Sequence, residues 1–120
     1  FEWLETLRRL SYLKPDGFVL ANDCRIDPMT VTSGQADYPE HDRIMAAMEE
    51  AAGRVCTIAG TQTALELGNV LCFNSVILGG LSKILGNDPD VWRAVIKDRV
   101  PQKAAALNLT AYEKGRDLIV

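Results

Sequence analysis

Apolar residues recur every three or four positions at the start of the chain, which is the spacing of one face of a helix. The stripe consists of Phe1, Leu4, Leu7 and Leu10 and predicts a helix over residues 1–13. A Pro-Asp-Gly sequence follows after one lysine and provides the turn that ends this helix.

A continuous apolar run, Phe18–Ala21, comes after this turn and is typical of a strand covered on both faces, as in parallel sheets. A second strand is predicted over residues 54–59. The helix between the two strands is predicted to begin at Pro39 and to end at Gly53. Strand, helix and strand in this order predict two parallel strands joined by a right-handed crossover.

The residues between the first strand and this helix, 22–37, form a long connection in which residues 29–32 can make a short strand. Asp23, Arg25 and Asp27 follow the first strand directly. Ligands of open α/β sheets bind beyond the carboxyl ends of strands, so this position favours a functional edge. We expect either a solvated loop or, if the loop is functional, contact with a partner subunit rather than catalysis.

Helical periodicity dominates the rest of the chain. Four helices are predicted over residues 61–67, 70–85, 91–100 and 103–118. Asp88 is the expected N-cap of the third of these helices, and Pro89 is its expected first residue. Two strands do not make a stable sheet alone. The pattern therefore predicts an α/β fold of three layers (αβα), present as a C-terminal fragment with about two parallel strands and a helix-rich C-terminal half.

Glycines and asparagines interrupt these apolar helices, although each costs roughly 0.5–1 kcal/mol of helix stability relative to alanine. Gly68 and Asn69 lie between two helices, where glycine can supply a positive-φ C-cap and asparagine can cap the next helix. Gly79 and Gly80 lie inside an apolar helical run rather than between a strand and a helix. They indicate the close approach of another backbone and not a phosphate-binding loop.

Two further asparagines, Asn74 and Asn108, are predicted as buried amides that need several hydrogen-bond partners. They either form internal hydrogen bonds or face a subunit or a substrate. Together with Asn69 they are the candidate substrate or interface residues of this chain. No catalytic residue and no metal ligand is predicted.

Composition narrows the class of protein further. The 120 residues are 48% hydrophobic with a net charge of −3, as in one soluble globular domain, and argue against nucleic acid or an anionic membrane as partner. Cys24, Cys56 and Cys72 lack the spacing of an iron–sulfur motif and indicate reduced thiols in the cytoplasm. His41, the single histidine, is expected to be an exposed side chain in the first turn of a helix.

Several short motifs occur in one collinear order that resembles the gamma-type domain of the 2-oxoacid:ferredoxin oxidoreductases, above all that of the indolepyruvate-specific branch. The motifs are Tyr12–Gly17, Tyr38-Pro39, Gly68-Asn69, Asn74, Leu78-Gly79 with Leu81, and Leu107-Asn108 with Ala111 and Gly115. Family members also carry a Gly-rich "GxGGQG" turn upstream, and nothing here matches it. The resemblance implies that residues 1–120 are the C-terminal part of such a domain, with the N-terminal part absent.

The resemblance also implies a function. The chain would belong to a subunit of an enzyme that oxidatively decarboxylates indolepyruvate, an aryl 2-oxoacid, to its acyl-CoA and passes electrons to ferredoxin. Thiamine diphosphate, Mg, 4Fe-4S clusters and CoA would be bound by a larger alpha subunit and not by this chain. Pyruvate, 2-oxoglutarate and branched-chain 2-oxoacids remain open as substrates. The alternative is a freestanding α/β module that binds a small molecule or acts as a scaffold without catalysis.

Overall fold

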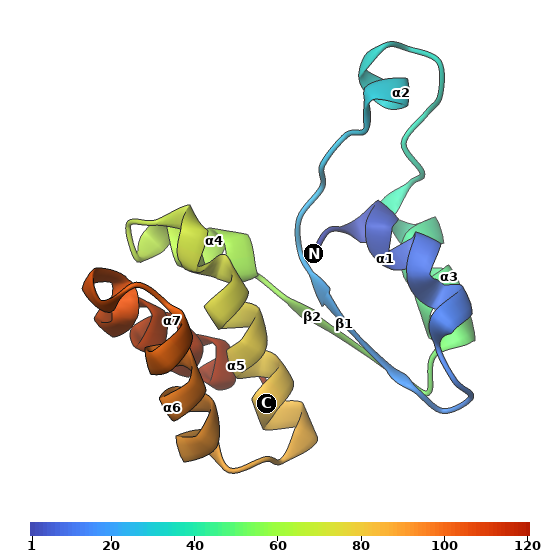
Figure 1. Cartoon of the computed structure of the whole chain (residues 1–120). Coiled ribbons are helices and arrows are strands. Elements are labelled where there is room, and N and C mark those ends of the chain that lie inside the picture. Colours follow the sequence, from blue (N-terminus) through green and yellow to red (C-terminus); the bar gives the residue numbers. More distant parts are fainter. The chain divides into compact units, whose positions relative to one another are not determined.

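The computed structural model describes residues 1–120, which divide into two compact units, residues 1–57 and residues 58–120 (Figure 1). We call them the N-terminal and the C-terminal unit and describe each by itself. None of the helices is both long enough and apolar enough to span a membrane.

The N-terminal unit combines two strands with the helices that precede and connect them. In chain order its elements are α1 (Trp3–Arg9), the 3₁₀ helix η1 (Leu10–Tyr12), β1 (Phe18–Asn22), α2 (Met29–Thr32), α3 (His41–Ala51) and β2 (Arg54–Ile58), whose last residue begins the C-terminal unit. The two strands are parallel neighbours in one sheet, and the Gly53 N–H donates to the Gly17 carbonyl at 2.8 Å where they begin. The predicted strand–helix–strand order is confirmed.

One apolar cluster holds α1, β1 and α3 together. Its buried members are Trp3 of α1, Val19 and Ala21 of β1, and Ile44 and Met48 of α3. Val19 and Ala21 are two residues apart, so they share one face of the strand, and Ile44 and Met48 are four apart, so they share one face of the helix. Burial of each large apolar side chain contributes about 1.5–3 kcal/mol, which makes this cluster the main source of stability in the unit.

Two predictions about this unit are wrong in detail. Residues 29–32 form the one-turn helix α2 at the end of a long loop rather than a strand (Figure 1). The Thr32 N–H donates to the Pro28 carbonyl and the Ser33 N–H to the Met29 carbonyl, so local bonds satisfy a segment that pairs with neither strand. Helix α3 begins at His41 and not at Pro39, because its first N–H donors bond to the Glu40 carbonyl.

The C-terminal unit is entirely helical after its first strand residue. Its elements are α4 (Gly60–Glu66), η2 (Val70–Cys72), α5 (Phe73–Leu85), α6 (Pro89–Arg99), η3 (Gln102–Ala104) and α7 (Ala105–Asp117). Asp88 caps α6 as predicted, because its Oδ1 accepts from the Asp90 N–H at 2.9 Å, and Pro89 is the first helical residue. The α/β class with two parallel strands and a helix-rich C-terminal half is confirmed.

Candidate functional site

Helices α5 and α7 approach so closely that glycine is required on both sides. A Cβ atom added to Gly79 would lie 2.0 Å from the Tyr112 carbonyl oxygen, and one added to Gly115 would lie 1.9 Å from the Val76 carbonyl oxygen. Both obstacles are backbone atoms, which cannot move unless a helix moves. The close approach predicted from Gly79 is confirmed, and its partner on α7 is Gly115.

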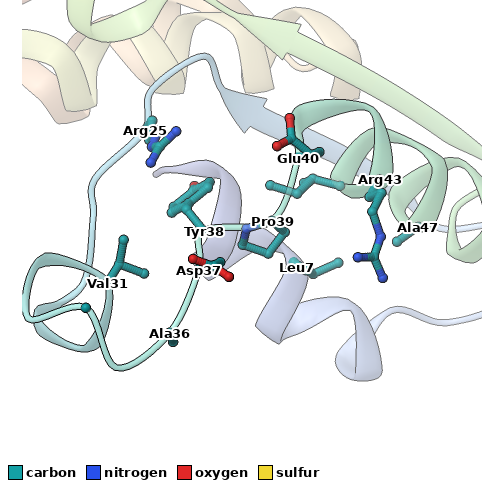
Figure 2. Close-up of a pocket in the computed structure, with 12 residues that line it drawn as sticks. Leu7, Arg25, Val31, Ala36, Asp37, Tyr38, Pro39, Glu40, Arg43 and Ala47 are labelled. Carbon is teal, nitrogen blue, oxygen red and sulfur yellow. The ribbon is translucent and has the colours of Figure 1, made fainter.

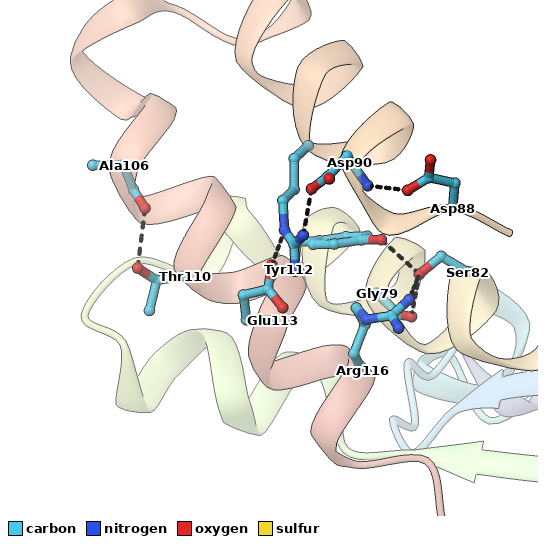
Figure 3. Close-up of polar contacts among 10 residues, drawn as sticks. Gly79, Ser82, Asp88, Asp90, Ala106, Thr110, Tyr112, Glu113 and Arg116 are labelled. Atoms are coloured by element: carbon cyan, nitrogen blue, oxygen red, sulfur yellow. Dashed lines mark hydrogen bonds and ion pairs between the residues drawn. The ribbon is translucent and has the colours of Figure 1, made fainter. Parts of the chain in front are cut away.

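A buried hydroxyl network completes this contact between the two helices (Figure 3). The Ser82 Oγ donates to the Gly79 carbonyl at 2.9 Å, and Arg116 Nη1 donates to the Ser82 Oγ at 2.9 Å. The Tyr112 hydroxyl lies 2.8 Å from the same Ser82 Oγ. Since serine has one hydrogen to donate and Gly79 receives it, Tyr112 is the donor of that bond. The network therefore orders the contact and leaves no hydroxyl of Ser82 or Tyr112 for chemistry.

Asn108 also links α7 to α5. The Ser75 hydroxyl donates to the Asn108 Oδ1 at 2.7 Å, and the Asn108 Nδ2 donates to the Ala104 carbonyl at 2.9 Å. The amide is half-buried rather than fully buried. Of the two roles left open for Asn108, these bonds favour the internal one.

The prediction that Asn74 is a buried amide is wrong. Asn74 is exposed in the first turn of α5, and its side chain bonds to no other group of the chain. The next two residues, Ser75 and Val76, are among the buried residues of this helix, so Asn74 lies off the face that packs. Its amide is therefore available to a group outside this chain.

Residues 69–71, a few positions before Asn74, are exposed as well, whereas Cys72 is buried. Gly68 has a φ of +87° after α4, and the Asn69 Oδ1 accepts from the Leu71 N–H at 3.0 Å, which confirms both predicted caps. Leu71 leaves 80% of its surface exposed, and Val70 is exposed too. Two asparagines and two large apolar side chains thus share one short segment, residues 69–74, which we call the α4–α5 corner.

A second candidate lies in the N-terminal unit, where the loop after β1 returns to α3. The Tyr38 hydroxyl donates to the Glu2 Oε2 at 3.0 Å and accepts from the Leu4 N–H at 3.2 Å. The Arg25 guanidinium lies over the Tyr38 ring, 4.3 Å from its centroid, and Arg25 Nε pairs with the Asp27 Oδ1 at 2.6 Å. Burial, followed by the hydrogen bond to Glu2, raises the pKa of Tyr38 above its ordinary value.

Of these residues, Arg25 and Tyr38 border an open cavity of about 760 Å³ between the loop and the helices α1 and α3 (Figure 2). Arg25, Asp37, Glu40 and Arg43 bring charges of both signs to its wall. The mixture provides no concentrated charge for an anion or a cation. Of the three loop residues predicted after the first strand, Arg25 and Asp27 take part in this cluster, whereas Asp23 is exposed and makes no contact with it.

Sequence reasoning did not identify this cluster as a unit. Trp3 lies outside the apolar stripe that predicted the first helix, yet it is buried and its ring meets the His41 ring edge-on with centroids 4.8 Å apart. His41 is otherwise exposed at the start of α3, as predicted. The only feature of the sequence that pointed to Tyr38 was its place in the Tyr38-Pro39 motif. Its partner Glu2 lies 36 positions away, a distance over which helical spacing gives no information.

The nucleophilic and metal-binding side chains do not gather at either place. No group of three or more His, Cys, Asp or Glu side chains is arranged to hold a metal ion. All three cysteines are free thiols, and burial raises the pKa of the Cys72 thiol, which lowers its reactivity.

Comparison with known proteins identifies the class of protein to which this fold belongs. Residues 1–118 match the family model described as pyruvate ferredoxin/flavodoxin oxidoreductase, so the chain belongs to that family. No solved structure matches the chain.

The chain is similar to proteins named indolepyruvate oxidoreductase subunit IorB. It is 35% identical to those of Thermococcus kodakarensis and Pyrococcus horikoshii over 118 residues, which cover 96% of this chain and 58% of each relative. It is 30% identical to that of Methanothermobacter thermautotrophicus over 117 residues, 96% of this chain and 60% of the relative. The chain thus spans less than two thirds of the length of these curated relatives.

Proposed function

We propose that this chain is part of the smaller subunit of a thiamine-dependent oxidoreductase that oxidatively decarboxylates indolepyruvate to its acyl-CoA and passes the electrons to ferredoxin. The observation that carries the proposal is the 35% identity, over 96% of this chain, to two relatives named as subunits of indolepyruvate oxidoreductase. Residues 1–120 would be the C-terminal part of its gamma-type catalytic domain, in the cytoplasm.

The side chains of this chain do not fit the cofactors of such an enzyme. An iron–sulfur cluster requires a set of cysteine thiolates, and Mg with thiamine diphosphate requires clustered oxygen ligands. Here the cysteines are scattered and no set of acidic side chains converges. We therefore assign thiamine diphosphate, Mg, the 4Fe-4S clusters and CoA to a larger alpha subunit, which would also pass electrons to ferredoxin.

Within this proposal the α4–α5 corner is the part of the chain that meets the partner subunit or the substrate. Asn69 and Asn74 lie there beside the exposed Leu71. Asn108 serves the same site indirectly, because its bond to Ser75 holds α7 against the start of α5, while its bond to the Ala104 carbonyl orients the amide. This assignment gives the asparagines a recognition role and no part in bond making or breaking.

Purification from the native host tests the proposal. A tagged chain should retain a larger polypeptide that contains thiamine diphosphate and iron–sulfur clusters. The isolated complex should reduce ferredoxin with CoA and indolepyruvate faster than with pyruvate, 2-oxoglutarate or a branched-chain 2-oxoacid. A preference for one of the latter acids would correct the substrate. A monomer or homodimer with an intact ligand site and no larger partner would favour the freestanding binding or scaffold module instead.

A further inference from the structure

The cavity between the loop after β1 and the helices α1 and α3 has no part in the function proposed above. Its volume of about 760 Å³ falls within the range of about 300–1,000 Å³ that is usual for small-molecule sites. All its walls belong to the N-terminal unit. The Tyr38 hydroxyl ties the loop wall to the start of α1 through its bonds to Glu2 and Leu4. The cavity is therefore formed within this unit before any ligand arrives.

Two opposite charges on the wall of this cavity have no partner in the chain. Arg43 of α3 and Asp37 of the loop both line it, and neither side chain forms a hydrogen bond or an ion pair. Figure 2 shows the side chains of Leu7 and Pro39 between the Asp37 carboxylate and the Arg43 guanidinium. Apolar surface thus separates a free anion from a free cation.

The remaining charges on the wall limit which ligands fit. Arg25 is already committed, because its Nε pairs with the Asp27 Oδ1 at 2.6 Å. Glu40 lines the cavity as well, and its side chain forms no cap bond to α3 and no ion pair. The unpaired groups of Asp37, Glu40 and Arg43 therefore carry one more negative than positive charge. A ligand with several negative charges is disfavoured, and one that carries both signs is matched.

We propose that this cavity binds a small zwitterion whose cation and carboxylate lie at opposite ends of an apolar body, which is the chemistry of a short apolar peptide with free termini. The Arg43 guanidinium would hold the terminal carboxylate, for which its paired N–H donors are suited. The Asp37 carboxylate would accept from the terminal ammonium. The apolar side chains would cover Leu7 and Pro39.

Three matched peptides test the two charged ends separately. The tripeptide alanyl-leucyl-alanine, titrated into the full chain and followed by amide chemical shifts, should bind saturably with a Kd of about 1 mM or lower. The shifts should change around residues 37–47. The same peptide acetylated at its amino end lacks the ammonium, and the peptide amidated at its carboxyl end lacks the carboxylate. Each should bind about tenfold more weakly, because each loses one charge-assisted hydrogen-bonded pair.

Two variants link each end of the peptide to one side chain. Arg43→Gln should weaken binding of the free tripeptide about tenfold but leave binding of the amidated peptide unchanged, since that peptide has no carboxylate to lose. Asp37→Asn should weaken the free tripeptide equally and leave the acetylated peptide unchanged. Both side chains are exposed, so the fold should be retained. Arg54→Gln, at an exposed arginine of β2 that does not line the cavity, is the control and should bind the free tripeptide like the unsubstituted chain.

Four outcomes would overturn the proposal. They are the absence of saturable binding, shifts that avoid the cavity, equal affinity for the free peptide and either capped peptide, and variants that weaken all three peptides alike. An acetylated and amidated peptide that binds as well as the free one would assign the cavity to an internal segment of a protein instead. No measurement of enzymatic activity is involved, so the result is separable from a failure of the proposed function.

Discussion

Tyr38 joins three segments of the N-terminal unit through one hydroxyl and one ring. The hydroxyl bonds to Glu2 and to the Leu4 N–H at the start of α1, and the ring carries the Arg25 guanidinium of the loop after β1. The hydroxyl can donate to the Glu2 carboxylate only while it is protonated. Burial and this bond together raise the pKa of Tyr38. The cluster therefore makes the stability of the unit depend on pH in the alkaline range.

The sign of that dependence is a prediction. The folded-state pKa of Tyr38 lies above the ordinary value of 10.0, so its stabilising contribution is complete below pH 10.0 and is lost as the pH rises through the raised pKa. Tyr38→Phe should cost about 1 kcal/mol at neutral pH through the lost hydrogen bonds and should reduce the loss of stability between about pH 8 and about pH 11. Urea unfolding at both pH values, with tyrosinate absorbance as a second readout, measures the effect.

Tyr12→Phe is the matched control, because Tyr12 is 80% exposed. It should leave both the stability and its pH dependence unchanged. If Tyr38→Phe and the unsubstituted chain lose stability equally at alkaline pH, Tyr38 does not couple the loop to α1 in the way described.

At the scale of elements, the pairing of α5 with α7 decides the shape of the C-terminal unit. Gly79 and Gly115 let the helices touch, and the bonds of Ser82 and Asn108 fix how they are aligned along their axes. Glycine usually lowers the stability of a helix. At these two positions, however, the absence of a Cβ atom allows the two helices to touch.

Gly115→Ala should therefore destabilise the chain although alanine is the better helix former. The added Cβ would lie 1.9 Å from the Val76 carbonyl oxygen, so α5 and α7 must separate. We expect a net loss of about 1–3 kcal/mol in the free energy of unfolding, larger than the gain of about 1 kcal/mol from helix propensity. Urea unfolding followed by far-ultraviolet circular dichroism gives this value.

Lys114→Ala, at the exposed neighbouring position on α7, serves as control and should change the free energy by less than about 0.5 kcal/mol. A Gly115→Ala chain more stable than the unsubstituted one would contradict the close approach of the helices.

At the scale of the whole molecule, the chain matches the pyruvate ferredoxin/flavodoxin oxidoreductase family over almost its whole length. The relatives to which it is similar are considerably longer than this chain. The α4–α5 corner of the C-terminal unit is the surface that we propose to meet the partner subunit or the substrate.

Asn74 tests this surface. Asn74→Ala should leave the unfolding free energy within about 0.5 kcal/mol of the original, because the side chain is exposed and bonds to nothing in the chain. In the purified complex it should weaken binding of the larger subunit about tenfold, or raise KM for the 2-oxoacid by a similar factor. Calorimetric titration and steady-state kinetics distinguish the two results.

Asn87→Ala provides the comparison, because Asn87 is also an exposed asparagine whose side chain bonds to no other group of the chain, in the turn before α6. It should affect neither binding nor kinetics. Equal behaviour of the two variants would remove Asn74 from the candidate site.

Structural features that depend only on neighbouring residues can be predicted from the sequence alone. Helical spacing, the cap at Asp88 and the glycine after α4 all act within a few positions, so the elements and most of their bounds follow from the order of residues. Gly79 indicated the close approach of another backbone, although only the fold identifies that backbone as α7. The family pattern identified the class of protein for a similar reason, since it consists of short motifs in a constant order.

Which polar side chains form hydrogen bonds within the chain, and which stay exposed, depends on the tertiary packing. Asn74 and Asn108 are the same residue type in helices of the same length, yet one is exposed and the other bonds to Ser75. The difference arises because the α5–α7 contact covers one face of each helix, and that face depends on which helices pair. Glu2 and Tyr38 are likewise brought together by the fold across 36 positions, a separation about which local spacing gives no information.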